Sequence, residues 1–200
     1  VFTRGKGTLG LNPFLCPKAT VFIIAEKIKL YPDEMYKDGM SIVVANRPRV
    51  PIACLDPQVK SLNYLNNILA KIEAIDAGVL EALMLNVDGE VAECTGDNIF
   101  IIKNEKISTP HVDAGILNGI TRQLVIDTIA PALGYEVEQR SVSLDEVKSA
   151  DEVFLTGTAA EVIGVTHIGH DVVGAGKVGV ITKLLEEEFK RLVASEAPED

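Results

Sequence analysis

Short apolar runs rich in β-branched residues recur along the chain and predict strands. Such runs cover residues 20–27, 41–51, 152–158 and 161–168, and a weaker one covers 135–140. Two longer segments, 81–95 and 98–109, each predict a β-hairpin. Asp88-Gly89 and Asn104 interrupt their apolar runs where a tight turn needs residues that tolerate positive φ. Tandem hairpins imply antiparallel pairing in at least part of the sheet.

A helical pattern stands out in VKSLNYLNNILAKIEA, residues 59–74. Leu62, Leu65, Leu69 and Ile72 recur at helical spacing, which predicts a helix over 58–75 that buries this stripe against a core. Lys60 then falls in the first turn, where the helix dipole does not favour a positive charge. Gly78 is a plausible stop for the helix.

Three more helices are expected downstream. Their ranges are 119–134, with Pro131 disturbing the last turn, 144–149, and 178–195, where one face is apolar and the other is rich in glutamate. Helices interspersed with antiparallel strands predict an α+β fold. The glycine-rich segment 4–13 is expected to form a loop. Residues 30–39 are polar and rich in turn residues, which predicts a linker or connecting loop. Val1 falls within an apparent strand, so we expect a missing N-terminal portion.

Composition limits the classes of function. The chain has 200 residues, of which 47% are hydrophobic and 24% charged, enough for one sizeable core. A net charge of −10 opposes binding to nucleic acid or an anionic membrane, since both require clustered cations. The apolar runs are shorter than a membrane span, so the expected location is the cytoplasm. The three cysteines are widely spaced and suggest neither a disulfide framework nor a metal site.

Two residues could take part in covalent or acid-base chemistry. Lys60 could act as a nucleophile toward a carbonyl if burial or a nearby cation lowered its pKa. The simpler alternative is an ordinary surface lysine. Glu93, in ECTGDN, could project into a cavity and pair with a buried cation such as a pyridinium nitrogen. The simpler alternative is a turn at a strand end.

Two turns of small residues could bind anions. Asn118-Gly119 precedes a predicted helix, which leaves the N–H groups of Ile120 and Thr121 free to bind a phosphate. The second turn, Gly157-Thr158-Ala159, allows a close approach to the backbone and adds the Thr158 hydroxyl. Each turn alone is compatible with an ordinary cap or loop. A lysine, a carboxylate and two anion-binding turns together suit pyridoxal phosphate.

In this order, the segments VKSLNYLNNILAKIEA, EVAECTGDNIF, GILNGITR and DEVFLTGTAAEV resemble the class IV aminotransferases, most closely the branched-chain amino-acid group. The resemblance spans about residues 40–195. It implies that residues 1–26 end a small N-terminal domain, 27–38 form an interdomain loop, and 39–200 form a large cofactor-binding domain. It also implies pyridoxal 5'-phosphate as the cofactor and a homodimer or larger assembly.

The same resemblance implies a role for each matching residue. Lys60 would bind the cofactor covalently and shuttle a proton, Glu93 would pair with the pyridine nitrogen, and Tyr64 would contact the phenolic oxygen. The phosphate would be held by Ile120 and Thr121, with help from Thr158. The backbone of Thr158 and Ala159 would receive the substrate carboxylate. The family's phosphate-binding arginine belongs to the small domain, most of which is absent from this sequence.

The implied reaction moves an amino group between branched-chain L-amino acids and 2-oxoglutarate. Lys60 is followed by Ser61-Leu62-Asn63, a sequence that resembles that of the D-amino-acid aminotransferases, whereas Tyr64 favours the branched-chain group. A D-amino-acid aminotransferase or an aminodeoxychorismate lyase of the same fold therefore stays open. A non-catalytic binding module that has kept the scaffold is a further alternative.

Overall fold

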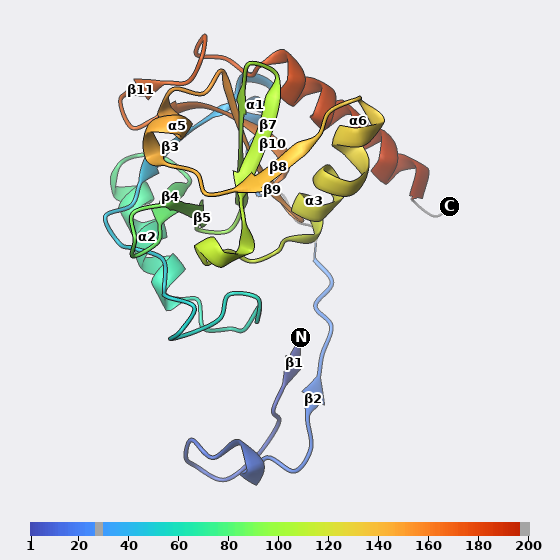
Figure 1. Cartoon of the computed structure of the whole chain (residues 1–200). Coiled ribbons are helices and arrows are strands. Elements are labelled where there is room, and N and C mark those ends of the chain that lie inside the picture. The colour runs from blue at the N-terminus through green and yellow to red at the C-terminus, as the bar shows by residue number, and fades with distance from the viewer. Residues whose placement is uncertain (27–29, 197–200) are drawn as a thin grey trace.

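The computed structural model describes residues 1–26 and 30–196, with the side chain of the last of these excluded. A body with one large sheet carries an N-terminal arm that extends away from it (Figure 1). The arm contains the two-stranded antiparallel sheet of β1 (Phe2–Thr3) and β2 (Thr20–Val21), with a 3-10 turn at Pro13–Leu15 between them. The apolar run at 20–27 is therefore a strand only at its start, and residue 27 lies outside the described residues.

The large sheet is mixed, and its neighbouring strands follow the order β5-β4-β3-β10-β9-β6-β7-β8, with β11 paired to β10. Its strands are β3 (Met40–Val44), β4 (Ala82–Leu85), β5 (Val91–Cys94), β6 (Asn98–Lys103), β7 (Lys106–Pro110), β8 (Val137–Arg140), β9 (Glu152–Gly157), β10 (Glu161–Ile168) and β11 (Asp171–Val172). The pairs β3·β4, β3·β10 and β7·β8 are parallel and the others antiparallel. Helices around this mixed sheet confirm the expected α+β class.

Both predicted hairpins are present. The turn between β4 and β5 contains Gly89 with φ 84°, a left-handed conformation that glycine adopts without strain. The turn between β6 and β7 places Asn104 and Glu105 at φ 49° and 62°. Positive φ at two successive residues matches the twist of the paired strands. The strand expected over 41–51 ends at Val44, and Pro48 and Pro51, which lack the N–H that a ladder needs, lie beyond it.

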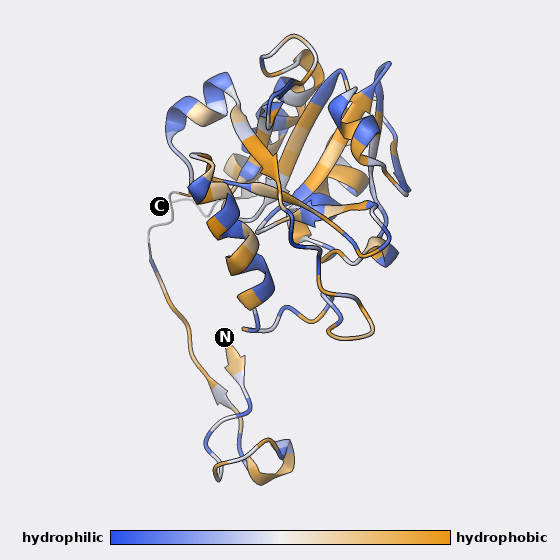
Figure 2. Ribbon diagram, turned by 90° about the vertical axis from the view of Figure 1, so that its left-hand side faces the viewer, coloured by the Kyte–Doolittle hydropathy of each residue, from blue (hydrophilic) through white to orange (hydrophobic). Residues whose placement is uncertain are grey.

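Helices cover both sides of the sheet, whose strands are mostly apolar (Figure 2). They are α1 (Asp33–Asp38), α2 (Leu65–Asp76), α3 (Ile120–Leu124), α4 (Ala130–Ala132), α5 (Leu144–Lys148) and α6 (Val180–Glu196). The first core cluster joins inward residues of the central strands to α5. The second lies beneath α3 and α6, where the rings of Phe100 and Phe154 stack with centroids 4.7 Å apart. Among the described residues, no helix is long and apolar enough to span a membrane.

Two segments differ from their predicted form. The connection at 30–39 contains α1, which packs against β10, and the buried Tyr31. The helix expected over 119–134 is interrupted, because α3 passes into a π-helical segment, Val125–Ile129, before α4. Pro131 lies within α4 and has no N–H to donate, so the regular α ladder is disturbed near it.

Candidate active site

Lys60 lies in the loop that precedes α2, not in a helical turn as predicted. The helix begins only at Leu65, because tight backbone turns occupy the residues before it: Ser61 N–H donates to the Val59 carbonyl and Tyr64 N–H to the Leu62 carbonyl. Lys60 is exposed in this chain. The expected burial of its amine is therefore wrong for the chain alone.

The apolar stripe of α2 also points the other way from the prediction. Ala70 and Ala74 are fully buried against β4, whereas Leu65 and Ile72 are 62% and 45% exposed. Two small alanines let the helix backbone approach the sheet closely, which leaves the larger side chains outside. Helical spacing identified the helix, but it did not identify the buried face.

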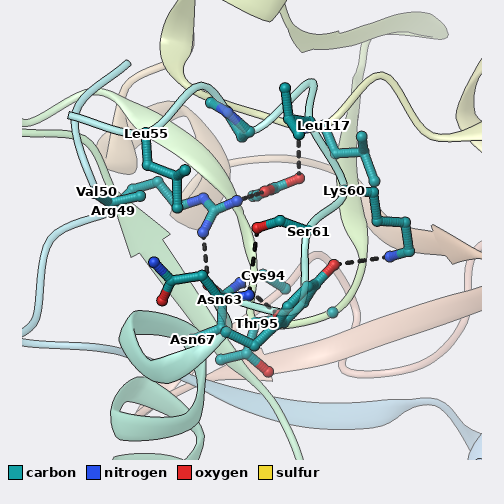
Figure 3. A pocket seen from close by; sticks show the side chains of 15 residues that line it. Arg49, Val50, Leu55, Lys60, Ser61, Asn63, Asn67, Cys94, Thr95 and Leu117 are labelled. Atoms are coloured by element: carbon teal, nitrogen blue, oxygen red, sulfur yellow. Dashed lines mark hydrogen bonds and ion pairs between the residues drawn. The ribbon is translucent and has the colours of Figure 1, made fainter. Parts of the chain in front are cut away.

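Lys60 and Tyr64 contact each other at the mouth of a pocket. The Lys60 Nζ donates to the Tyr64 hydroxyl at 2.8 Å and lies 5.3 Å from the centroid of its ring (Figure 3). The four-residue separation brings the amine over the phenol although only Tyr64 adjoins the helix. A phenol and an amine in contact can exchange hydrogen-bonding partners with a ligand that enters between them.

Glu93, near the end of β5, is buried with 6% exposure and has three partners in the protein. Its Oε1 lies 2.6 Å from Arg49 Nη2 in a buried ion pair. Its Oε2 accepts from the Asn98 side-chain amide and from the Leu117 N–H, each at 3.1 Å. Arg49 and Leu117, from segments far apart in the sequence, both bind this carboxylate. Three donors thus fix its direction.

Burial raises the pKa of Glu93 to about 7. The Arg49 charge and hydrogen bond, the Leu117 N–H and the Lys60 charge all oppose the rise, because each stabilises the ionised form. The carboxyl therefore titrates near neutral pH. A further cation placed against Glu93 would lower the pKa of this carboxyl group and favour its ionised form.

One pocket unites the catalytic candidates. Lys60, Tyr64 and Glu93 line it together with Arg49, Asn67 and Leu117 (Figure 3). Its walls are tied together by side-chain bonds: Arg49 Nη1 donates to Asn67 Oδ1 at 2.7 Å, and Asn67 Nδ2 donates to the Thr95 carbonyl at 2.8 Å. Segments far apart in the sequence therefore meet in one place. Lys60 and Glu93 line the same pocket, as the hypothesis of a single cofactor site requires.

The predicted anion-binding residues lie outside that pocket lining. Thr121 is buried with 5% exposure, the Ile120 side chain is 81% exposed, and Thr158 is exposed. Ile120 and Thr121 open α3, so their N–H groups have no acceptor within the helix. Ala159 lines a separate groove beside α1 and α6. The structure thus groups Lys60, Tyr64 and Glu93, and it leaves Ile120, Thr121, Thr158 and Ala159 outside that lining.

Asn98 connects the two regions and has no counterpart in the sequence prediction. Its Nδ2 donates both to Glu93 Oε2 and, at 2.8 Å, to the Leu117 carbonyl in the turn before α3. A Cβ on Gly119 would lie 2.3 Å from Asn98 Oδ1, so a larger residue there would displace the Asn98 side chain. Arg49 is the other residue that was missed. Position in ECTGDN could have drawn attention to Asn98, but no local pattern distinguishes a buried arginine from an exposed one.

Comparison with known proteins identifies the family. The family model for amino-transferase class IV matches residues 1–168. A putative branched-chain-amino-acid aminotransferase of Methanocaldococcus jannaschii is 48% identical over 190 residues, which are 95% of this chain and 65% of that protein. A D-alanine aminotransferase of Bacillus licheniformis is 37% identical over 165 residues, 82% of this chain and 56% of that protein.

Solved structures agree with the sequence relatives. The branched-chain amino acid aminotransferase of Thermobaculum terrenum in its PLP-form is 37% identical with a TM-score of 0.76, covering 79% of this chain and 52% of that one. The branched-chain aminotransferase of Thermoproteus uzoniensis with norvaline is 34% identical with a TM-score of 0.77, covering 90% of this chain and 56% of that one. The chain thus spans about half to two thirds of these proteins. It belongs to the class IV aminotransferases.

Proposed function

We propose that this chain provides the cofactor-binding part of a pyridoxal-phosphate transaminase that moves the amino group between branched-chain L-amino acids and 2-oxoglutarate. The observation that carries the proposal is one pocket lined by an amine, a phenol and a buried carboxylate, those of Lys60, Tyr64 and Glu93. Family membership supports it, as does the 48% identity to a putative branched-chain-amino-acid aminotransferase.

The residues present fit pyridoxal phosphate. Lys60 provides the amine that a carbonyl cofactor requires, and it stands next to a phenol that can bond to an oxygen on the ring. Glu93 is a buried carboxylate held by a guanidinium, ready to accept from a protonated ring nitrogen. When bound, the cofactor supplies the electron sink on which amino-group transfer depends. The N–H groups at the start of α3, with the Thr158 hydroxyl, would hold its phosphate.

Within this scheme each residue has one task. The Lys60 Nζ would carry a proton to and from the substrate's α carbon, and the Tyr64 hydroxyl would keep the amine positioned between transfers. Arg49 would favour the ionised form of Glu93 by opposing the effect of burial on its pKa. The backbone of Thr158 and Ala159 would bind the substrate carboxylate. An apolar pocket would separate branched side chains only modestly, by about 1 to 3 kcal/mol per methylene.

The second candidate is a D-amino-acid aminotransferase. It is favoured by the 37% identity to a D-alanine aminotransferase and by the Ser61-Leu62-Asn63 spelling after Lys60. Turnover with 2-oxoglutarate and either L-leucine or D-alanine separates the two, and aminodeoxychorismate tests the lyase. Activity with L-leucine is expected, and its absence beside activity with D-alanine would replace the first proposal. Absence of activity and of visible cofactor absorbance would favour the non-catalytic module.

We also propose a homodimer or larger assembly, in which the exposed face of α2 contributes to the contact. Leu65, Ile68, Ile72 and Ile75 are 62%, 52%, 45% and 58% exposed along one side of the helix. A continuous apolar face of this kind is typical of an interface. Light scattering after size-exclusion chromatography is expected to show at least a dimer, and Ile68→Glu is expected to weaken it. A monomeric wild-type chain would reject the proposal.

The division into domains and the location in the cell stay predictions. We assign residues 1–26 to the end of a small domain, 27–38 to the connection and 39–200 to the large domain. The separate sheet of β1 and β2 supports this division. Limited proteolysis is expected to leave the large domain as a resistant fragment. A cytoplasmic location is expected from the composition, and cell fractionation would test it.

A further inference from the structure

Asp97 lies where three segments of the body meet. It is 4% exposed, and its Oδ2 accepts from the Tyr31 hydroxyl at 2.8 Å. The same hydroxyl lies 3.4 Å from Glu81 Oε2. On the other side, a Cβ added to Gly157 would lie 2.2 Å from Asp97 Oδ1, so this carboxyl rests directly against the end of β9. Asp97 thus contacts the segment before α1 and the end of β9, and the shared Tyr31 hydroxyl links it to Glu81, the residue before β4.

Two carboxyl groups therefore share a dry site, and their surroundings differ. Glu81 is 1% exposed; its Oε1 accepts from the N–H groups of Ala82 and Thr95 and from the Thr95 hydroxyl, and its Oε2 lies 3.5 Å from Lys71 Nζ. These partners hold the Glu81 carboxyl group in place. Asp97 accepts the Tyr31 bond beside it, and a neutral Asp97 avoids repulsion between two neighbouring carboxylates.

The charges around Asp97 agree with this assignment. Burial raises its pKa to about 7, and the Glu81 charge adds to the rise. The Tyr31 hydrogen bond and the more distant charges of Lys71 and Lys60 oppose it. Burial also raises the pKa of the Tyr31 phenol and of the Cys94 thiol, the other titratable groups at the site, so both stay neutral.

Asp97 is placed to act on the candidate active site. It immediately precedes Asn98, whose side chain holds Glu93 and the turn before α3. Gly157, against which it packs, immediately precedes Thr158 and Ala159. A small displacement of Asp97 would therefore shift both the carboxylate end of the pocket and the second anion-binding turn.

We propose that Asp97 is a proton-linked positioning residue: its neutral form seats the turn at 157–160 against the loop that carries Glu93 and Asn98, and its ionisation beside Glu81 loosens that contact. The consequence for cofactor affinity rests on the proposed function. The local change at residues 157–160 is independent of the proposed function. Ionisation of Asp97 places its charge next to the Glu81 carboxyl group in a buried site.

Hydrogen exchange measured by mass spectrometry tests the local change. Exchange of the peptide covering 155–161 is followed from pH 5.5 to 8.5, after division by the intrinsic rate at each pH. The wild-type chain is expected to lose protection above about pH 7, by up to about tenfold per pH unit. Asp97→Asn is expected to abolish this step, although Glu93 still titrates. Asp88→Asn, an exposed acid in the β4–β5 turn, is the matched control and is expected to leave it unchanged.

Two further variants predict shifts of opposite sign and keep the test valid if Asp97→Asn fails to fold. Tyr31→Phe removes a bond that stabilises the ionised form, so the step is expected at higher pH. Glu81→Gln removes a like charge, so the step is expected at lower pH. Protection independent of pH in the wild type, the same step in Asp97→Asn, or shifts of the opposite sign would overturn the proposal.

Cofactor retention supplies a second readout. Pyridoxal phosphate is titrated into the wild-type chain and Asp97→Asn across the same pH range, and the visible absorbance reports binding. The wild type is expected to lose affinity above pH 7 more steeply than the variant. Equal pH profiles would overturn the role in positioning. If neither protein binds pyridoxal phosphate, the proposed function fails, while the exchange experiment still decides the local claim.

Discussion

The buried ion pair between Arg49 and Glu93 gives the sharpest energetic prediction. Its atoms lie 2.6 Å apart, and the two side chains are 9% and 7% exposed. Arg49→Met leaves the Glu93 carboxyl buried without its cation, and loss of one partner of such a pair costs about 3 to 5 kcal/mol. The Asn67 amide oxygen also loses its Arg49 donor. Arg47→Met, two residues away at an exposed position, is the matched control.

The cost of Arg49→Met is expected to depend on pH. Because Arg49 lowers the pKa of Glu93, its removal raises that pKa above the present value of about 7. At pH 6 the Glu93 carboxyl in the variant is then mostly neutral. The loss in the free energy of unfolding is expected to fall to about 1 to 3 kcal/mol, which is the cost of leaving buried polar groups unpaired. At pH 8 the full loss of about 3 to 5 kcal/mol is expected, because the buried carboxyl must then either keep a proton that the unfolded chain releases or ionise without its cation.

Urea unfolding followed by circular dichroism at pH 6 and pH 8 measures both values. The double variant Arg49→Met, Glu93→Gln is expected to be more stable at pH 8 than Arg49→Met alone, because no unpaired charge remains. A loss in Arg49→Met no larger than in Arg47→Met would refute the reasoning. An equal loss at both pH values, or costs that simply add in the double variant, would refute it as well.

Three further outcomes are expected. Lys60→Ala abolishes turnover and leaves the urea midpoint within error, because Lys60 is exposed; residual transamination above a few per cent of wild type would contradict its role. Gly119→Ala destabilises the chain by about 1 to 3 kcal/mol in the same unfolding assay, because its Cβ would lie 2.3 Å from Asn98 Oδ1. Gly96→Ala is the control, because the nearest atom to a Cβ there is 4.0 Å away. The free energy of unfolding falls between pH 4 and 8, because burial raises the pKa of Asp97 to about 7 and the unfolded chain releases that proton first; Asp97→Asn is expected to flatten the decline, and a stability that rises over this range would contradict the assignment.

Local patterns predicted the strands and turns well. The residues that fix both hairpins, Asp88-Gly89 and Asn104, act on their own backbone, so their effect is visible without the rest of the fold. The same holds for the capping box at Ser143 and Glu146, which starts α5 within the predicted range. For these turns and this cap the sequence was sufficient, whereas the tight turns at 59–64 that delay the start of α2 were not predicted.

The orientation of α2 could not be predicted in the same way. Its apolar stripe is real, but the sheet selected the small face of Ala70 and Ala74, and that choice depends on how closely β4 can approach. Burial of Lys60 was one of the two conditions considered for its activation, and it depended on a helix start near residue 58; the helix begins at Leu65 and Lys60 is exposed. Periodicity gives the spacing of side chains, while the partner surface decides which of them are covered.

In the candidate site, too, some residues could be identified from the sequence and others depend on tertiary packing. Lys60, Tyr64 and Glu93 were identified from chemistry and from the resemblance, and they do line one pocket. Arg49 and Asn98, which orient Glu93, depend on contacts across 44 and 5 positions of sequence and on the burial of both partners. Residues that orient a catalytic candidate in this way are positioned by tertiary packing, and a single sequence contains little information about them. Asp97 belongs to the same class, because its neighbours Tyr31 and Glu81 come from distant segments.

The central claim is that Lys60 is the amine that binds the cofactor in the pocket lined by Glu93. Incubation with pyridoxal phosphate, reduction with borohydride and peptide mass mapping test it most directly. One phosphopyridoxyl group is expected on the peptide that contains Lys60, and none is expected in Lys60→Ala. Labelling at another lysine, or the same labelling in Lys60→Ala, would contradict the claim.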